Sequence, residues 1–228
     1  MGSDDLHHKR KAKQAKDLER RKAMRRRYDK VLIVCEGSKT EPLYFEELKD
    51  YYELDTANIK ISGNCGSAPL SVVTHGEDLY KQELEECNEP FDRVYCVFDK
   101  DTHPSYLEAL QKVTALKPQN TFYAVTSVPC FEVWLLLHFR YSAAPIISCG
   151  KKSAGDNALD ELTRYMPNYK KGDSGTFLEL FPRLEIAKTH AERLKAQCEA
   201  TKTDNPTTSI FELVNYLQNI KTPPEAKQ

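Results

Sequence analysis

Short apolar segments alternate with longer amphipathic ones along most of the chain. The continuous apolar run at 31–35 (VLIVC) is typical of a strand that is buried on both faces. Further strands are predicted at 57–61, 91–98 and 121–126. Because strands and helical stretches alternate, the pattern predicts an α/β fold with a parallel, Rossmann-like sheet flanked by helices and joined by right-handed crossovers.

The helical stretches show apolar residues at helical spacing and begin at recognisable residues. After the first strand, Gly37 permits a tight turn, Thr40 can cap a helix and Pro42 suits its first turn. A short, very apolar helix is expected after Pro129, and residues 142–155 are expected to form a loop. The other helices are expected at 70–87, 104–116, 156–166, 177–200 and 208–220.

Charge divides the chain unevenly, although its net charge is only −1. Residues 1–30 carry twelve Lys and Arg against five Asp and Glu, whereas the remainder carries 21 against 29. This predicts a basic arm at 1–30, an α/β core at 31–140, a helical extension packed on it at 141–222 and a tail at 223–228. A basic arm on an acidic body indicates contact with nucleic acid or an acidic partner, and the alternative is a solvated N-terminal helix.

Cysteine usage and hydropathy restrict the class of protein. The seven cysteines are loosely spaced and form no C-x-x-C pair, so neither a disulfide framework nor a structural zinc site is expected. A reducing compartment, the cytoplasm, is therefore predicted. No apolar run approaches 18 residues and no signal peptide is recognisable, so no membrane contact is expected. No nucleotide-binding glycine motif occurs, which argues against an NTPase or a dinucleotide enzyme.

Three acids follow the predicted strands directly. Glu36 comes after the first strand, and Asp99 and Asp101 come after the third. Because the carboxyl ends of parallel strands share one edge, these acids are expected to converge there. Carboxylates that close repel one another unless a cation lies between them, and oxygen ligands favour Mg²⁺ or Mn²⁺. Alternatively, each acid is merely a helix-entry or turn residue.

Two further acids are candidate ligands. Glu132 lies in the apolar segment 130–139, where a buried carboxylate is costly unless it meets a cation or a basic partner. Its alternative is a solvent-facing position in the first turn, which favours acids. Glu41 follows the first strand closely and either joins the metal site or is a first-turn acid.

Basic groups that could assist these acids lie elsewhere in the chain. Either Lys170 or Lys171 could neutralise charge that develops on a scissile phosphate, and the alternative is a solvated lysine pair. His103 and His138 are candidates for proton transfer, although a lone histidine is more often structural.

Four sequence blocks together resemble a known family. Glu-Gly after the first strand and Asp-x-Asp after the third resemble the Toprim domain of topoisomerases, primases and OLD-type nucleases. The longer pattern is similar to the RloB family over about residues 20 to 200. Its blocks are VCEGSKTEPLYF at 34–45, VFDKD at 97–101, SVPCFEVWLLLHF at 127–139 and YKK at 169–171.

The resemblance implies a Toprim-like fold and a role in bacterial defence against phage by abortive infection. It also implies a partner, an AAA/ABC-type ATPase such as RloA. By that analogy the ATPase senses the infection or controls the activity of this chain, and this chain cleaves nucleic acid. By position, the first three acids match the Toprim glutamate and Asp-x-Asp pair, and Glu41 and Glu132 match recurrent acids of the family. Lys171 falls where related nucleases supply a late lysine, whereas Val128 stands where a polar residue is expected.

The leading hypothesis is a metal-dependent endonuclease acting on DNA or RNA. Glu36 would bind metal and act as a base, the Asp pair would hold Mg²⁺ or Mn²⁺ with Glu132 and Glu41, and Lys171 would stabilise the transition state. The chain could also form a homo-oligomer. Contacts to nucleic acid are expected from Arg20, Arg21, Arg25, Arg26, Arg27 and Lys170.

Two other readings remain open from the residues. A phosphatase of the haloacid-dehalogenase type shares an Asp-x-Asp motif, but there the motif ends the first strand and here it follows the third. A non-catalytic effector would bind the ATPase through a vestigial acidic site.

Overall fold

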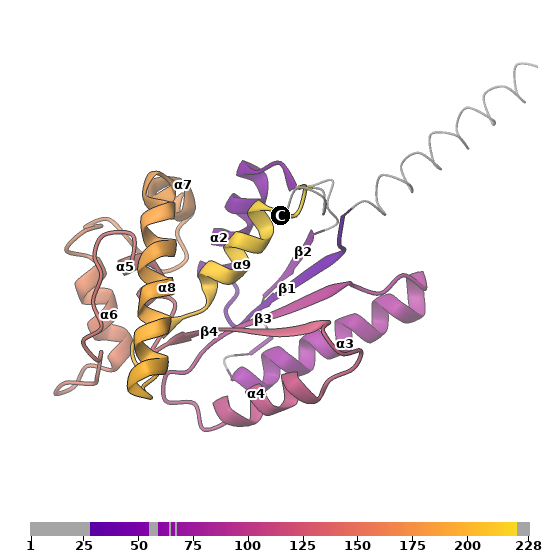
Figure 1. Cartoon of the computed structure of the whole chain (residues 1–228), viewed down its shortest axis with the longest axis horizontal. Coiled ribbons are helices and arrows are strands. Elements are labelled where there is room, and N and C mark those ends of the chain that lie inside the picture. The colour runs from indigo at the N-terminus through magenta and orange to yellow at the C-terminus, as the bar shows by residue number, and fades with distance from the viewer. Residues whose placement is uncertain (1–27, 55–58, 64, 67, 223–228) are drawn as a thin grey trace, which may run out of the picture.

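A computed structural model of the 228-residue chain describes residues 28–54, 59–63, 65–66 and 68–222 and has a sheet at its centre (Figure 1). Its strands are β1 (Val31–Cys35), β2 (Ile59–Ser62), β3 (Arg93–Asp99), β4 (Phe122–Val128) and β5 (Thr207–Thr208).

The strand order is β2-β1-β3-β4-β5. The first four strands pair in parallel, and β5 pairs antiparallel with the end of β4. This arrangement confirms the predicted α/β class with a mainly parallel, Rossmann-like sheet. In the central pair, Cys35 of β1 lies opposite Val97 of β3, so that the two strands end side by side.

Helices cover both faces of the sheet, which explains why the first strand is apolar at every position. Val31, Ile33 and Cys35 enter one hydrophobic cluster, and Leu32 and Val34 enter the other. Figure 1 shows α3 and α4 together on one side and α2 and α9 on the other. These helices are α2 (Thr40–Tyr51), α3 (Pro69–Cys87), α4 (Tyr106–Ala115) and α9 (Ile210–Gln218).

The remaining helices gather at the end of the sheet where β4 leads into them (Figure 1). The predicted helix at 177–200 is interrupted, because Pro182 lies in a short 3₁₀ turn, η2. The segments are α5 (Glu132–Leu136), α6 (Ala154–Leu162), α7 (Thr176–Leu180), η2 (Phe181–Arg183) and α8 (Leu184–Thr201).

Two helix starts differ from the sequence prediction. Lys39, not Thr40, is the capping residue of α2, and it makes no side-chain cap hydrogen bond. α6 begins earlier than predicted, because the Ser153 hydroxyl accepts from the Asp156 N–H at 3.0 Å. The Asp156 carboxylate in turn accepts from the Ser153 N–H at 2.9 Å, which completes a capping box.

One hydrophobic cluster joins the sheet to the C-terminal helices. It contains Ile33 of β1, Trp134 of α5, Leu194 of α8 and Val214 of α9, all fully buried. No helix in the described part of the chain is both long and apolar enough to cross a membrane.

Some predictions fall on residues that the structure does not describe. These are the basic arm up to residue 27, the tail at 223–228 and the first part of the predicted strand at 57–61. The predicted nucleic-acid contacts outside the described residues are Arg20, Arg21, Arg25, Arg26 and Arg27.

Candidate functional site

The ends of β1 and β3 place two acids side by side. Glu36 directly follows β1, and its backbone N–H donates to the carbonyl oxygen of Val97 at 3.1 Å. Asp99 is the last residue of β3, and its N–H donates to Glu36 Oε2 at 3.2 Å. The parallel register therefore brings together carboxylates that are 63 positions apart in the sequence.

The connection from β4 to α5 is tied to the same strand end. The N–H of Phe131 donates to Asp99 Oδ2 at 3.0 Å, and the N–H of Asp101 donates to the carbonyl oxygen of Pro129 at 2.9 Å. Glu132, the first residue of α5, is only 1% exposed. The acid on the apolar helix thus lies beside the acids of the strand ends.

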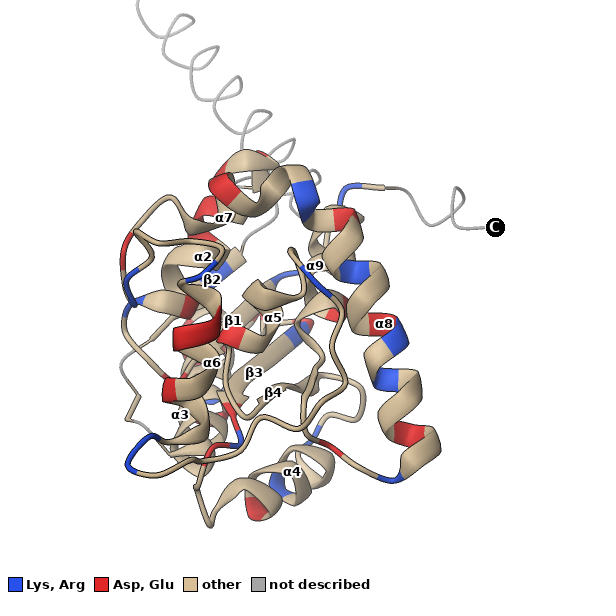
Figure 2. Cartoon of the chain, turned by 90° about the vertical axis from the view of Figure 1, so that its left-hand side faces the viewer, with Lys and Arg blue, Asp and Glu red and all other residues tan. Residues whose placement is uncertain are grey.

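These acids line one cavity of about 530 Å³ at the carboxyl edge of the sheet. Figure 2 looks onto this end of the molecule, with α5 and α6 towards the viewer. All five acids predicted as metal ligands line it, namely Glu36, Glu41, Asp99, Asp101 and Glu132. We call this cavity the acidic pocket. Asp156 lines it as well, and Lys171 is the one basic side chain among its described lining residues.

Glu132 uses its two oxygens differently. Its Oε1 lies 2.9 Å from the ammonium of Lys171 and accepts from the Tyr169 hydroxyl at 3.4 Å. Its Oε2 is buried and has no hydrogen-bond partner among the described residues. Glu132 therefore has the basic partner that its buried position requires, and the alternative of a solvent-facing acid is wrong.

Burial and mutual repulsion raise the pKa values of these carboxyl groups. Burial, followed by the charges of Glu41 and Glu132, raises the pKa of Asp99 well above its usual value. Burial, followed by the charges of Glu132 and Glu36, raises the pKa of Glu41 to about 7. Burial also raises the pKa of Glu36, against the opposing N–H of Asp99. The carboxylates in the pocket are thus poorly hydrated and repel one another, and a bound cation would relieve both effects.

The predicted basic groups separate into those near the pocket and those away from it. Burial would lower the pKa of Lys171, but the charge of Glu132 and its hydrogen bond raise it, so that Lys171 stays charged. His103 Nε2 lies 3.6 Å from Glu36 Oε1. Lys170 is exposed and does not line the pocket.

His138 is a structural residue. Its Nδ1 donates to the carbonyl oxygen of Trp134 at 3.0 Å, and its side chain is buried. Burial lowers its pKa to about 4, so that it is neutral at ordinary pH. It does not line the acidic pocket.

Two glycines allow loops to pass closely beside the acids. A side chain at Gly63, directly after β2, would come within 2.4 Å of the carbonyl oxygen of Gly37 in the turn after β1, so position 63 requires glycine. Gly172, next to Lys171, has a φ of +84° and lies against the side chain of Lys39. Both close approaches depend on tertiary structure.

The acids fit Mg²⁺ or Mn²⁺ in chemistry. Their donors are carboxylate oxygens, and one buried oxygen, Glu132 Oε2, has no hydrogen-bond partner among the residues that the structure describes. In the described part of the chain, however, no group of three or more His, Cys, Asp or Glu side chains is already arranged to hold a metal ion. The carboxylates would have to rotate towards a common centre to bind one.

Residues beside the acids were not predicted as part of the site. Tyr169 contributes its hydroxyl to Glu132, and Cys130 lines the pocket. Ser153 and Asp156 form the capping box at its edge. The Ser-x-x-Asp spacing is visible in the sequence, whereas the contact of Tyr169 depends on the folded chain.

Comparison with known families gives a match over most of the chain. A family model described as RloB-like protein matches residues 31–217. The matched span begins at β1 and includes every acid of the acidic pocket and Lys171. Neither the curated proteins nor the solved structures gave a match.

Proposed function

The chain belongs to the RloB-like family, and on that premise we propose that it is a metal-dependent nuclease that hydrolyses phosphodiester bonds. The observation that carries the proposal is the convergence of the five predicted metal ligands and one lysine on a single cavity at the carboxyl edge of the sheet. Ligands of open α/β sheets bind at this edge, and acids with raised pKa values are typical of catalytic sites.

In the proposed site, Glu36, Glu41, Asp99, Asp101 and Glu132 would hold Mg²⁺ or Mn²⁺, which would supply positive charge for the phosphate and an activated water molecule. Lys171 keeps its positive charge beside them and can approach a phosphate oxygen on which charge develops. In the absence of a metal ion, burial and the neighbouring carboxylates raise the pKa of Glu41 to about 7, so this group can take or release a proton near neutral pH. Glu36 and His103 lie 3.6 Å apart, close enough to exchange a proton through one water molecule.

The biological setting is part of the same proposal. The resemblance to the RloB family and to Toprim nucleases supports a cytoplasmic effector of phage defence that works with an AAA/ABC-type ATPase. The chain itself carries no nucleotide-binding glycine motif, so any ATP dependence would come from that partner. The basic arm and Lys170 would contribute phosphate contacts.

The first test measures metal binding. Calorimetry with Mn²⁺ should detect binding to the wild type and little binding to Asp99→Asn. A matched control, Asp78→Asn, changes an exposed acid on α3 and should bind as the wild type does. Absence of binding to the wild type at millimolar Mn²⁺ would contradict the proposal.

The second test measures cleavage. RNA and DNA, single-stranded and duplex, are incubated with Mn²⁺ and the chain, with and without its ATPase partner. Metal-dependent cleavage that disappears in Asp99→Asn and persists in Asp78→Asn is the expected result. Cleavage that survives in Asp99→Asn would assign it to a contaminant or to another site.

A non-catalytic effector is the second candidate. It is favoured by the absence of a ready coordination set among the described residues and by the pairing of Glu132 with Lys171. If Asp99→Asn retained full protection against phage, this candidate would replace the nuclease.

A further inference from the structure

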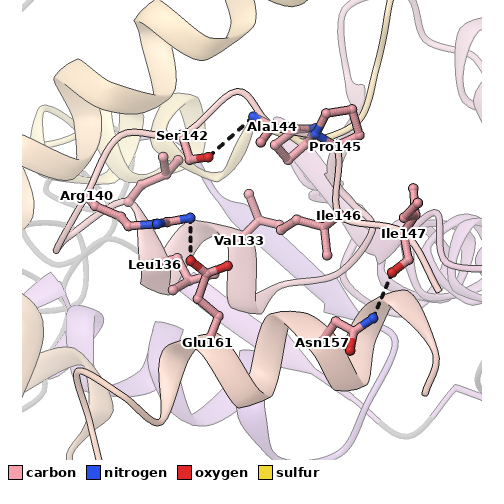
Figure 3. A pocket seen from close by; sticks show the side chains of 12 residues that line it. Val133, Leu136, Arg140, Ser142, Ala144, Pro145, Ile146, Ile147, Asn157 and Glu161 are labelled. Atoms are coloured by element: carbon pink, nitrogen blue, oxygen red, sulfur yellow. Dashed lines mark hydrogen bonds and ion pairs between the residues drawn. The ribbon is translucent and has the colours of Figure 1, made fainter. Parts of the chain in front are cut away.

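A second cavity lies between α5, the segment 142–147 and α6 (Figure 3). Its volume is about 230 Å³, and we call it the apolar cavity. Figure 3 shows Val133 and Ile146 on its walls, with Asn157 and Glu161 reaching it from α6. Aliphatic side chains thus form the walls, and polar groups stand at the rim.

The two cavities share two walls. On α5, Glu132 lines the acidic pocket and the next residue, Val133, lines the apolar cavity. On α6, Asp156 lines the first and Asn157 lines the second. The two cavities are therefore lined by adjacent residues of the same two helices.

A basic turn connects the cavities on the surface. Ile147 lines the apolar cavity and Ser153 lines the acidic pocket. Between them, Cys149 and Lys152 exchange two backbone hydrogen bonds, of 3.0 and 3.1 Å, and close a turn. The exposed Lys151 lies within this turn, so the segment that links the two cavities carries a solvent-accessible positive charge.

We propose that the apolar cavity receives one unpaired base of the strand that is cut in the acidic pocket, with an intervening phosphate near Lys151. The inference deepens the proposed function and rests on it. A base can enter a cavity only after it leaves the double helix, so the substrate class is single-stranded nucleic acid or an unpaired loop.

The size and rigidity of the cavity suit a planar ring. A dry protein cavity of about 150 Å³ already holds benzene, so about 230 Å³ accommodates a larger ring. Its walls are held before any ligand arrives. Asn205 bonds the N–H and the carbonyl oxygen of Ile146, at 3.0 and 2.9 Å, and Asn157 donates to the carbonyl oxygen of Ile147 at 2.7 Å.

Charge and polarity favour a base over an apolar side chain from a protein partner. Arg140 and Glu161 form an ion pair at the rim, and both remain partly exposed. Such a pair offers donors and acceptors to the edge of a base, whereas an aliphatic side chain would leave them unused. The positive charge of Lys151 can likewise neutralise a backbone phosphate.

The test fills the cavity. Ala144 is exposed and lines the cavity, so Ala144→Phe places a ring in it without disturbing the core. Ala115→Phe, at the exposed end of α4, is the matched control. Fluorescence anisotropy in EDTA measures the affinity for labelled single-stranded RNA and DNA. Ala144→Phe should weaken binding about tenfold, which is the effect of removing one well-buried group, and the control should not.

An abasic scan sharpens this test. Wild type should lose a similar affinity when one particular base of the oligonucleotide is removed. In Ala144→Phe the same removal should have no further effect. Lys151→Gln should reduce the salt dependence of binding without changing the position of the sensitive base.

The outcomes separate this inference from the proposed function. If Ala144→Phe binds oligonucleotide as tightly as Ala115→Phe does, while Asp99→Asn still abolishes cleavage, the base cavity is wrong and the nuclease stands. If Ala144→Phe weakens binding but Asp99→Asn cleaves normally, the proposed nuclease site is wrong. If Ala144→Phe retains oligonucleotide and loses the ATPase, the cavity receives a protein, which overturns the inference.

Discussion

At the amino ends of β1 and β3, Glu83 and Asp29 each have a basic partner, whereas at the carboxyl ends the acids outnumber their basic partners. Lys30, just before β1, pairs with Glu83 at 2.6 Å. Arg93, the first residue of β3, pairs with Asp29 at 3.1 Å and lies over the ring of Tyr216 at 4.5 Å. These contacts join chain segments that are far apart in sequence.

The acidic pocket is built from the opposite ends of the same two strands. Six acidic side chains line it, with one lysine among the described lining residues. Charges that are paired stabilise the fold, while charges that repel one another lower its stability and are typical of functional sites. The comparison therefore assigns stability to one edge of the sheet and chemistry to the other.

The largest expected effect is on cleavage at the carboxyl edge. Asp99→Asn should reduce the rate at least about 1000-fold, which corresponds to about 4 kcal/mol of activation free energy. The melting temperature should stay the same or rise, because one charge leaves a crowded group. Cleavage assays and calorimetric melting of the same variant check this. A large fall in melting temperature would show that Asp99 stabilises the fold, which contradicts the assignment of stability to the amino edge and chemistry to the carboxyl edge.

Metal should stabilise the protein through the same edge. At a Mn²⁺ concentration about 100 times Kd, binding adds about 2.7 kcal/mol to the free energy of unfolding. Excess EDTA should reverse the gain in the wild type. Thermal melting of Asp99→Asn should be insensitive to both additions, and an equal shift in that variant would place the ion elsewhere.

A smaller effect is expected at the amino edge. Arg93→Met removes an ion pair and contacts with the rings of Tyr123 and Tyr216, and should lower the free energy of unfolding by about 2 kcal/mol. Cleavage should be unchanged at temperatures where the variant is folded. Urea denaturation measures the loss. Lys81→Met, which removes an exposed pair with Glu77, is the control and should change little.

The smallest effect concerns the pH dependence of stability without metal. The pKa of Glu41 is about 7 in the folded protein and 4.5 without the fold. Its contribution is complete below pH 4.5 and is lost as the pH rises to about 7. Relative to wild type, Glu41→Gln should therefore gain about 1–2 kcal/mol between pH 6 and pH 8. Urea titrations in EDTA at both values measure this gain, and a constant difference would contradict it.

Much of the fold and part of the candidate site could be predicted from local sequence patterns. The apolar run at 31–35 indicated a strand covered on both faces, and the position of Glu36 and Asp99 after strands indicated their convergence. β5 was not predicted, because its two residues are too short to show any alternation. Its pairing with β4 depends on where α8 returns the chain.

Tertiary contacts account for the rest. No spacing in the sequence links Lys171 to Glu132, since the pair forms only when the loop after α6 lies over α5. The apolar cavity likewise combines residues of α5 and α6 with Pro206, and its members have no common periodicity. Long-range pairing therefore sets which acid is neutralised and which cavity lies beside it.

The pair of Lys171 and Glu132 joins a half-exposed cation to an almost fully buried acid. Because Lys171 is part of the chain, it can neutralise Glu132 during folding without a metal ion. Small zinc domains differ, since they are unfolded when the metal is absent. A newly made chain can thus reach its native shape while divalent ions are scarce. We expect refolding from urea in excess EDTA to restore the native near-ultraviolet signal, and failure to refold would show that the lysine is an insufficient substitute.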